Sequence, residues 1–358
     1  MNKLKVCVYA ICKNESKFIE RWLNSIKDAD CVCVLDTGST DDSVSKLQKA
    51  NVIVEQKIFD KFRFDVARNE SLRLIPKDID VCICLDIDEI LMPGWRQALE
   101  KTWDNQTTRL RYVYNWSLDE HDNPRVSFYS DKIHSRNNYK WVNPVHEILS
   151  YQKENECFKT TDELVINHYP DNTKSRSSYL PLLELSVEED PENDRNTHYL
   201  GREYMYYGRW EDAIKMLKKH LELKSAVWKD ERCASMRFIS RCYQALKNNE
   251  EAKKWLERAI IEAPHLRDPL VEMALLYYQE KNWQKVITYC EEAKRIPINY
   301  KTYINEVFSF DETVDDLLSL AYYNIGDKEK AIIYAKKALE INPENDRIKS
   351  NLEIIKNG

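Results

Sequence analysis

Short apolar segments alternate with amphipathic segments over the first 110 residues. Four apolar runs have the length and composition of buried strands: 6–11, 31–35, 52–56 and 81–85. The segments between them are predicted to be helices, at 16–26, 43–50 and 65–74. The first of these helices carries its apolar side chains on one face. Strands that alternate with helices predict a parallel α/β sheet with right-handed crossovers.

The pattern changes between residues 109 and 150. Two segments rich in β-forming residues, 109–114 and 125–129, flank the turn residues Asp122-Asn123-Pro124. This arrangement predicts a β-hairpin. A loop rich in aromatic and polar side chains follows, and it runs through Trp141 and His146-Glu147.

From about Pro191 the pattern becomes helical and repeats itself. Small apolar side chains return at intervals of 39, 34 and 45 residues, at Ala213, Ala252, Val286 and Ala331. This spacing resembles the tetratricopeptide repeat, whose ideal period is about 34 residues. The resemblance implies stacked helix pairs that approach closely where side chains are small. The longer last interval predicts an inserted segment at about 297–310. We therefore expect two domains, 1–185 and 186–358.

Composition and charge narrow the class of protein. Hydrophobic residues make up 43% and charged residues 32% of the 358 positions, as in a globular chain rather than a disordered one. Residues 1–185 hold 26 basic and 29 acidic side chains and the net charge of the chain is −6, so each half carries about −3. Because both halves are slightly acidic, neither is expected to bind nucleic acid. No apolar run has bilayer-spanning length and no export signal is recognisable, so we expect a cytoplasmic protein without a membrane span.

The ten cysteines predict no special chemistry by their spacing. Half of them lie in predicted strands, where a free cysteine behaves as a small apolar residue: Cys7, Cys31, Cys33, Cys82 and Cys84. The chain contains no Cys-x-x-Cys pair, so neither a zinc motif nor a redox motif is indicated. Reduced thiols are the expected state in a cytoplasm.

An acidic pair, Asp86 and Asp88, follows the predicted strand 81–85. Ligands of parallel α/β sheets bind at the carboxyl ends of the strands. Two carboxylates at such an end suit a divalent cation and the phosphates that it carries. The alternative is an ordinary acidic turn after a strand.

Four polar elements lie at or just after the carboxyl ends of successive strands. They are Lys13-Asn14-Glu15, Asp36 to Asp41, Asp65 to Glu70, and Asp86-Ile87-Asp88. In this order they resemble the inverting family 2 glycosyltransferases of the GT-A fold, and the likeness runs from Val6 to about Asp171. Segments 141–147 and 165–170 extend it to the subgroup in which tetratricopeptide helices follow the transferase, which includes bacteriocin-modifying S- and O-glycosyltransferases. The resemblance implies an α/β GT-A domain, Rossmann-like, followed by an all-α repeat domain.

The resemblance implies nucleotide-sugar binding by side chains of all four elements. Asp36 would contact the base, typically uracil, and Glu15 would approach the nucleoside. Arg68 would reach the nucleotide or its diphosphate. Asn69 would bind beside Arg68. Asp65 would either hold Arg68 or contact the base. Asp86 would contact the ribose hydroxyl or a metal-bound water.

The resemblance also implies a metal site and a general base. Asp88 would ligate Mg²⁺ or Mn²⁺ that bridges the diphosphate, and His168 would complete the site. Inverting transfer needs a base that deprotonates the acceptor as it attacks. Glu147 and His146 are the candidates: either could be the base, or His146 could orient Glu147.

The resemblance favours an enzyme that moves a hexose or N-acetylhexosamine from a nucleotide-diphosphate donor, typically a UDP-sugar, to a peptide, protein or glycan. One alternative is a non-catalytic repeat scaffold with a degenerate transferase domain. Another is a nucleotidyltransferase, although the turn at residues 12–15 lacks the glycines usual for that class. The repeats could hold the acceptor, or they could form a homodimer.

Overall fold

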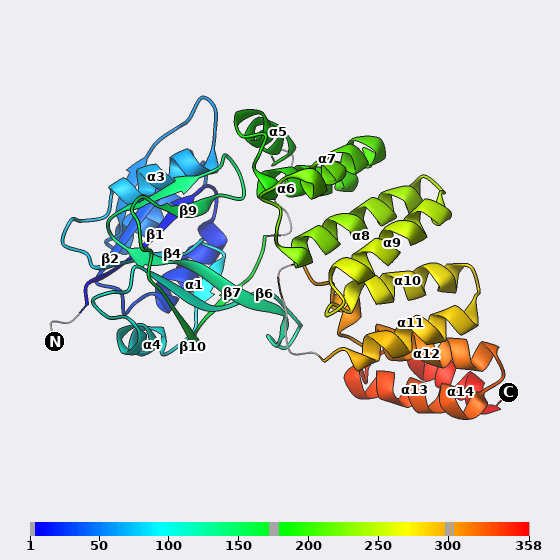
Figure 1. The fold of residues 1–358 in the computed structure, drawn as a ribbon. Coiled ribbons are helices and arrows are strands. Elements are labelled where there is room, and N and C mark those ends of the chain that lie inside the picture. Colours follow the sequence, from blue (N-terminus) through cyan, green and yellow to red (C-terminus); the bar gives the residue numbers. More distant parts are fainter. Residues whose placement is uncertain (1–3, 172–178, 298–301, 303, 358) are drawn as a thin grey trace. The chain divides into compact units, whose positions relative to one another are not determined.

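A computed structural model describes residues 4–171, 179–297, 302 and 304–357 (Figure 1). The chain divides into two compact units: an α/β unit, Met1–Ser186, and a helical unit, Val187–Gly358. Helix α5 (Tyr179–Glu189) contains the boundary between them. In the described residues, no helix combines the length and the apolar character that crossing a bilayer requires.

The α/β unit is built on an eight-stranded sheet in the order β3-β2-β1-β4-β7-β6-β10-β5. The strands are β1 (Val6–Cys12), β2 (Cys31–Asp36), β3 (Ile53–Gln56), β4 (Val81–Cys84), β5 (Glu89–Leu91), β6 (Arg109–Leu118), β7 (Pro124–Ser135) and β10 (Phe158–His168). The first four run parallel to one another, which confirms the parallel arrangement predicted for this part of the chain. β6 and β7 form the predicted hairpin, and β7 pairs antiparallel with β4.

Both faces of the parallel part of the sheet are covered, as expected for strands that are apolar throughout. Successive side chains of a strand point to opposite faces. On one face Val8 belongs to the core cluster that contains Trp22 of α1 (Ser16–Ser25), and helices α2 (Ser43–Lys49) and α4 (Trp95–Thr102) contribute to the same cluster. On the other face Tyr9 packs with Leu72 of α3 (Phe64–Arg73) and with Trp141. Trp141 belongs to a small separate sheet, β8 (Tyr139–Val142) with β9 (Ile148–Tyr151).

The helical unit consists of consecutive helix pairs, which confirms the predicted repeat. The helices of the pairs are α6 (Asp194–Tyr206), α7 (Trp210–Glu222), α8 (Lys229–Ala245), α9 (Asn249–Glu262), α10 (Asp268–Gln279), α11 (Trp283–Arg295), α12 (Thr313–Asn324) and α13 (Lys328–Ile341), and α14 (Asp346–Asn357) follows them. The four positions that mark the repeat lie in the second helix of each pair and have no exposed surface: Ala213, Ala252, Val286 and Ala331.

Small residues allow the paired helices to approach closely. A Cβ atom added to Gly201 of α6 would lie 2.6 Å from Cγ of Leu217 in α7. The second helices of later pairs begin at side-chain caps, because Asn248, Asn282 and Asp327 each accept a hydrogen bond from a backbone N–H three residues on.

The predicted insertion at 297–310 lies between α11 and α12. Residues 298–301 and 303 of this segment lie outside the described part of the chain, and the rest includes a 3₁₀ turn, Val307–Ser309. Arg237 of α8 donates to the carbonyl of Ile304 at 2.7 Å, and Asp268 of α10 accepts from the backbone N–H of Glu306 at 2.6 Å. Buried charged groups of two different pairs therefore anchor the end of this segment.

Candidate active site

The carboxyl ends of β2, β1 and β4 bring three of the predicted polar elements to one edge of the sheet. Cys12, the last residue of β1, is paired with Asp36, the last residue of β2, and Glu15 follows three residues after Cys12. Asp86 follows two residues after the end of β4, which is the other neighbour of β1. Because neighbouring strands are about 4.8 Å apart, the parallel topology gathers these acids at one edge.

Asp36 is fully buried. One of its two carboxylate oxygens accepts hydrogen bonds from neighbouring groups, mainly in the turn that follows β2. Oδ1 accepts from the backbone N–H groups of Gly38 at 3.2 Å and Ser39 at 3.1 Å, and from the side chain of Gln56 at 3.3 Å. Gly38 has φ +108°, a conformation that glycine adopts without steric cost and that closes this turn. Among the described residues, Oδ2 has no hydrogen-bond partner. A buried carboxylate oxygen left in this state is costly, so it is a candidate acceptor for a ligand N–H.

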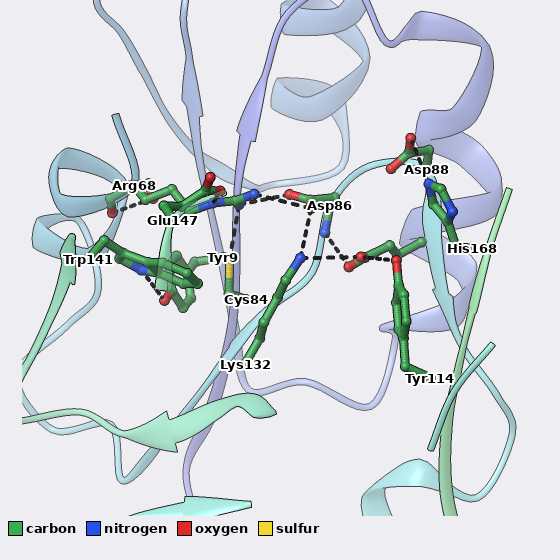
Figure 2. A network of polar contacts seen from close by, with 12 residues as sticks. Tyr9, Arg68, Cys84, Asp86, Asp88, Tyr114, Lys132, Trp141, Glu147 and His168 are labelled. Carbon is green, nitrogen blue, oxygen red and sulfur yellow. Dashed lines mark hydrogen bonds and ion pairs between the residues drawn. The ribbon is translucent and has the colours of Figure 1, made fainter. Parts of the chain in front are cut away.

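Asp86 is clamped by two cations (Figure 2). Arg68 of α3 makes a bidentate pair with it, with Nη1 2.7 Å from Oδ1 and Nη2 3.1 Å from Oδ2. Lys132 of β7 places Nζ 3.0 Å from Oδ2. Burial by itself would raise the pKa of the Asp86 carboxyl, but Arg68 and Lys132 hold that pKa well below its usual range. Asp86 is therefore a fixed anion at the end of β4.

Arg68 joins Asp86 to Glu147, one of the two base candidates. Nε of Arg68 lies 2.6 Å from Oε1 of Glu147, and Nη1 donates to Sγ of Cys84 at 3.1 Å. The side chain of Arg68 is only 5% exposed, and its guanidinium lies 5.2 Å from the ring centroid of Trp141. The structure thus brings together three of the predicted residues, namely Arg68, Asp86 and Glu147.

A second layer of contacts supports Asp86, and no pattern in the sequence indicated the part of it that comes from Tyr114 and Lys132. Glu89 accepts from the backbone N–H of Asp86 at 2.9 Å and from the hydroxyl of Tyr114 at 2.8 Å. Nζ of Lys132 lies 3.4 Å from the same carboxylate. Burial raises the pKa of the Glu89 carboxyl. Lys132 and Tyr114 come from the β6–β7 hairpin, so only the pairing register of β7 with β4 reveals that they reach this site.

Asp88 and His168 lie next to each other, as a shared metal site requires (Figure 2). His168 is the last residue of β10 and is paired with Glu89 in the sheet, and Nε2 of His168 is 3.6 Å from Oδ2 of Asp88. Nδ1 of His168 lies 3.1 Å from the carbonyl of Trp116, and the two rings stack with centroids 4.7 Å apart. With its proton on Nδ1 and donated to that carbonyl, His168 presents an Nε2 lone pair.

The donor set at Asp88 and His168 fits a divalent cation. A carboxylate oxygen and an imidazole nitrogen are ligands that Mn²⁺ accepts, and Mg²⁺ accepts the carboxylate. The side chains of Asp88 and His168 are 22% and 11% exposed, so neither ligand is sealed from a donor nucleotide. Burial lowers the pKa of the His168 imidazole, but the hydrogen bond and the charge of Asp88 outweigh burial, so that pKa is raised.

The other predicted residues have mainly structural contacts. Asn69 binds both the backbone carbonyl and the backbone N–H of Trp141, at 2.8 and 2.9 Å. Asp65 forms an ion pair with Arg63 at 3.0 Å and not with Arg68, so of its two expected roles only the base contact stays a prediction. His146 has φ +52°, and its ring lies against that of Tyr179 with centroids 5.8 Å apart.

The backbone of Glu15 is fixed, while its predicted contact with the nucleoside stays a prediction. Its N–H donates to the hydroxyl of Ser43 at 2.9 Å, which joins the loop after β1 to the start of α2. The nucleotide contact of Asn69 and the choice between His146 and Glu147 as base also stay predictions.

Sequence profiles of known families agree with this architecture. The profile described as "Glycosyl transferase family 2" matches residues 7–150. Two profiles described as "Tetratricopeptide repeat" match residues 238–264 and 316–345. Among solved structures, "Crystal structure of MamA protein" is 22% identical with TM-score 0.36 and covers 48% of this chain and 85% of that chain. A tetratricopeptide protein of Thermus thermophilus, TTC0263, is 17% identical with TM-score 0.36 and covers 50% and 89%.

Two curated relatives carry the same name. They are "SPbeta prophage-derived glycosyltransferase SunS" of Bacillus subtilis (strain 168) and "Glycosyltransferase SunS" of Bacillus phage SPbeta, each 27% identical over 228 residues. The match covers 59% of this chain and 52% of each relative, so the chain spans about half the length of the curated relatives it matches. The profile matches therefore identify a family 2 glycosyltransferase domain at residues 7–150 and tetratricopeptide repeats in the helical unit.

Proposed function

We propose that this protein transfers a sugar, with inversion, from a nucleotide-diphosphate donor, typically a UDP-sugar, to a peptide, protein or glycan in the cytoplasm. The observation that carries the proposal is the arrangement at the end of β4. There Asp86 is held by Arg68 and Lys132, and Asp88 lies 3.6 Å from His168. Anionic metal ligands and fixed cations at the carboxyl edge of a parallel sheet are what a nucleoside diphosphate needs.

The nucleoside would bind over β1 and β2. In the proposal, Oδ2 of Asp36 accepts the ring N–H of the base, which supplies the hydrogen bond that this buried atom lacks among the described residues. Because Asp36 has no exposed surface, the turn that follows β2 must shift to admit the base. Glu15 lies at the end of the neighbouring strand, where the nucleoside would pass.

The diphosphate would lie beside Asp88. In the proposal Asp88 and His168 hold Mn²⁺ or Mg²⁺, and a divalent ion bound there neutralises charge on the departing diphosphate. Arg68 and Lys132 supply two further positive charges next to Asp86. Since both are fixed by ion pairs before the donor arrives, little reorganisation is needed as charge develops.

We infer that Glu147, rather than His146, is the base. An acceptor hydroxyl or thiol attacks the anomeric carbon from the side opposite the diphosphate, and the bond from that carbon to the phosphate oxygen breaks. In the proposal Oε2 of Glu147 takes the acceptor proton, while Arg68 keeps the carboxylate in place through Oε1. His146 packs against Tyr179 instead, which suits a role in shaping the loop before Glu147.

A donor panel tests the proposal. The full chain is incubated with UDP-, GDP- and TDP-sugars and Mn²⁺, and the release of nucleoside diphosphate is measured. We expect one donor class to be turned over, and we expect Asp88→Asn to lower the rate by at least about 100-fold. Asp60→Asn changes an exposed aspartate of the same unit and serves as the matched control. If no donor is turned over and none binds in the presence of Mn²⁺, the proposal is wrong.

A further inference from the structure

Three cysteine thiols meet at the opposite end of the parallel sheet. They belong to Cys7 of β1 and to Cys31 and Cys33 of β2, and their Sγ atoms all lie within 4.8 Å of one another. Sγ of Cys33 is 3.7 Å from Sγ of Cys7 and 3.7 Å from Sγ of Cys31. Cys7 and Cys33 are fully buried, whereas Cys31 is partly exposed.

The sheet register produces this cluster, and the sequence spacing could not show it. Cys7 and Cys31 are direct neighbours in the parallel pairing of β1 with β2. Cys31 and Cys33 are two residues apart in one strand, so their side chains share a face. Cys31 is the first residue of β2 and Asp36 is the last. At about 3.3 Å per residue the cluster therefore lies roughly 10–16 Å from the nucleotide edge, and it is separate from the candidate active site.

Packing in an apolar cluster accounts for the burial of Cys7 and Cys33, but it does not require three sulfur atoms to lie next to one another. Seven other cysteines are present, and in the described part of the chain none of them belongs to a group of three close metal-ligating atoms. Cys290, for example, is buried in an apolar cluster of the helical unit. The three sulfur atoms of β1 and β2 thus form a donor set that the ordinary use of cysteine as a small apolar residue does not require.

The type and number of the ligands indicate which ion would bind. Thiolates favour soft cations such as Cu(I), and Zn²⁺ in closed sites takes four ligands. The two carboxylates whose charges reach Cys31 are already engaged, because Asp30 pairs with Arg96 at 2.7 Å and Asp78 with Lys5 at 2.6 Å. Three sulfurs in a plane around a metal about 2.3 Å away would be about 4.0 Å apart. Two of the three observed separations are 3.7 Å and the third is within 4.8 Å, so a small movement of the side chains would give this trigonal arrangement.

We propose that Cys7, Cys31 and Cys33 form a trigonal thiolate site for a single thiophilic cation, Cu(I) in a cell. The partly exposed Cys31 thiol provides the entry point, and the two buried thiols complete the site. On binding, the thiols give up their protons to solvent and the sulfur lone pairs form the metal bonds, with no change of oxidation state.

A chelator competition tests the site. The reduced full-length protein is titrated without oxygen into the Cu(I) complex of bicinchoninate, and the loss of the coloured complex gives stoichiometry and affinity. We expect the protein to withdraw one Cu(I) per chain. Cys31→Ser, which keeps the size of the side chain, is expected to weaken this binding at least about tenfold. Cys157→Ser removes another partly exposed thiol of the same unit and should leave the binding unchanged.

X-ray absorption of the loaded protein distinguishes the proposed site from weaker surface binding. Three sulfur neighbours at about 2.3 Å support the proposal. Coordination by two sulfurs, equal affinity of the wild type and Cys31→Ser, or tight Zn²⁺ binding without Cu(I) binding would each overturn it. A circular dichroism melt checks that Cys31→Ser is folded, and Cys33→Ser provides a second variant with the same expected loss.

Discussion

At the scale of single residues, Lys132 holds the active-site carboxylates in place. Its ammonium lies 3.0 Å from Asp86 and 3.4 Å from Glu89, and Arg68 alone would leave the second of these carboxylates without a cation. We therefore infer two roles for Lys132. It neutralises the Glu89 carboxylate that supports Asp86, and its positive charge lies where it could attract the donor diphosphate.

We predict that Lys132→Met destabilises the α/β unit and weakens donor binding. Removing one partner of a buried ion pair costs about 3–5 kcal/mol, and because Lys132 is 26% exposed we expect a smaller loss of about 2 kcal/mol. Urea unfolding of the full chain measures this loss in the free energy of unfolding. Lys101→Met removes an exposed pair with Glu163 and should cost at most about 1 kcal/mol. Equal losses for the two variants would show that Lys132 contributes no more than an exposed lysine.

A buried histidine makes the stability of the same unit depend on pH. Trp141 donates to the hydroxyl of Tyr9 at 2.9 Å, and this hydroxyl lies 2.8 Å from Nε2 of His134. Nδ1 of His134 lies 2.7 Å from the carbonyl of Ser135. With the proton on Nδ1, the whole chain of hydrogen bonds is satisfied by a neutral ring. Burial lowers the pKa of His134 to about 3.

The sign of the pH effect follows from this pKa. The unfolded chain has a histidine pKa of about 6.5, so between about pH 6.5 and pH 3 unfolding takes up one extra proton. Stability is fully present above about pH 6.5 and is lost as the pH falls through this window. From pH 7.5 to 5.5 one such group contributes a loss of roughly 1.4 kcal/mol.

We predict that His134→Gln flattens the pH dependence by about this amount, although the variant is less stable at every pH. His121→Gln, in the exposed turn of the hairpin, should keep the wild-type slope. Free energies of unfolding at the two pH values measure the difference. If His134→Gln loses as much stability on acidification as the wild type, the neutral buried ring is not the cause.

At the scale of secondary-structure elements, the contact between α6 and α7 depends on a missing side chain. A Cβ atom at Gly201 would meet Leu217 at 2.6 Å from Cγ and 3.1 Å from the backbone nitrogen. Alanine is about 1 kcal/mol better than glycine inside an isolated helix. Here the overlap should outweigh that gain, because crowding a packed interface typically costs about 1–3 kcal/mol.

We therefore predict that Gly201→Ala lowers the stability of the helical unit by about 1–2 kcal/mol. The double variant Gly201→Ala with Leu217→Ala provides the test of mechanism. If overlap is the cause, the double variant should lose less than the sum of the single losses, because the shortened side chain makes room. Simple additivity of the two losses would point to a different cause.

The sequence predicted the local elements well and the long-range register poorly. The apolar runs located β1, β2, β3 and β4 to within about a residue, because burial on both faces gives an uninterrupted apolar pattern. The acids at Glu15, Asp36 and Asp86 could be predicted because strand ends gather at one edge. The contacts of Lys132 and Tyr114 could not, since they depend on how β7 pairs with β4. The cluster of Cys7, Cys31 and Cys33 escaped prediction for the same reason, because it depends on how β1 pairs with β2.

At the scale of the whole molecule, the proposed chemistry lies in one unit and the repeat in the other. All residues of the candidate active site belong to the α/β unit, from Glu15 to His168. The boundary between the units lies within α5, so a division after Glu189 keeps this helix intact. We therefore expect donor binding to require residues 1–189 and not residues 190–358.

Separate expression of 1–189 and 190–358 tests this expectation through thermal unfolding with UDP and Mn²⁺. A ligand that binds the native state at about 100 times its Kd stabilises it by about 2.7 kcal/mol, whatever else the chain contains. The shift of fragment 1–189 should therefore equal that of the α/β unit in the full chain, and fragment 190–358 should show none. A much smaller shift in 1–189 would mean that the repeats contribute to the donor site. An equal shift leaves the repeats free to act on the acceptor or on a second copy of the chain, since donor binding then places no demand on them.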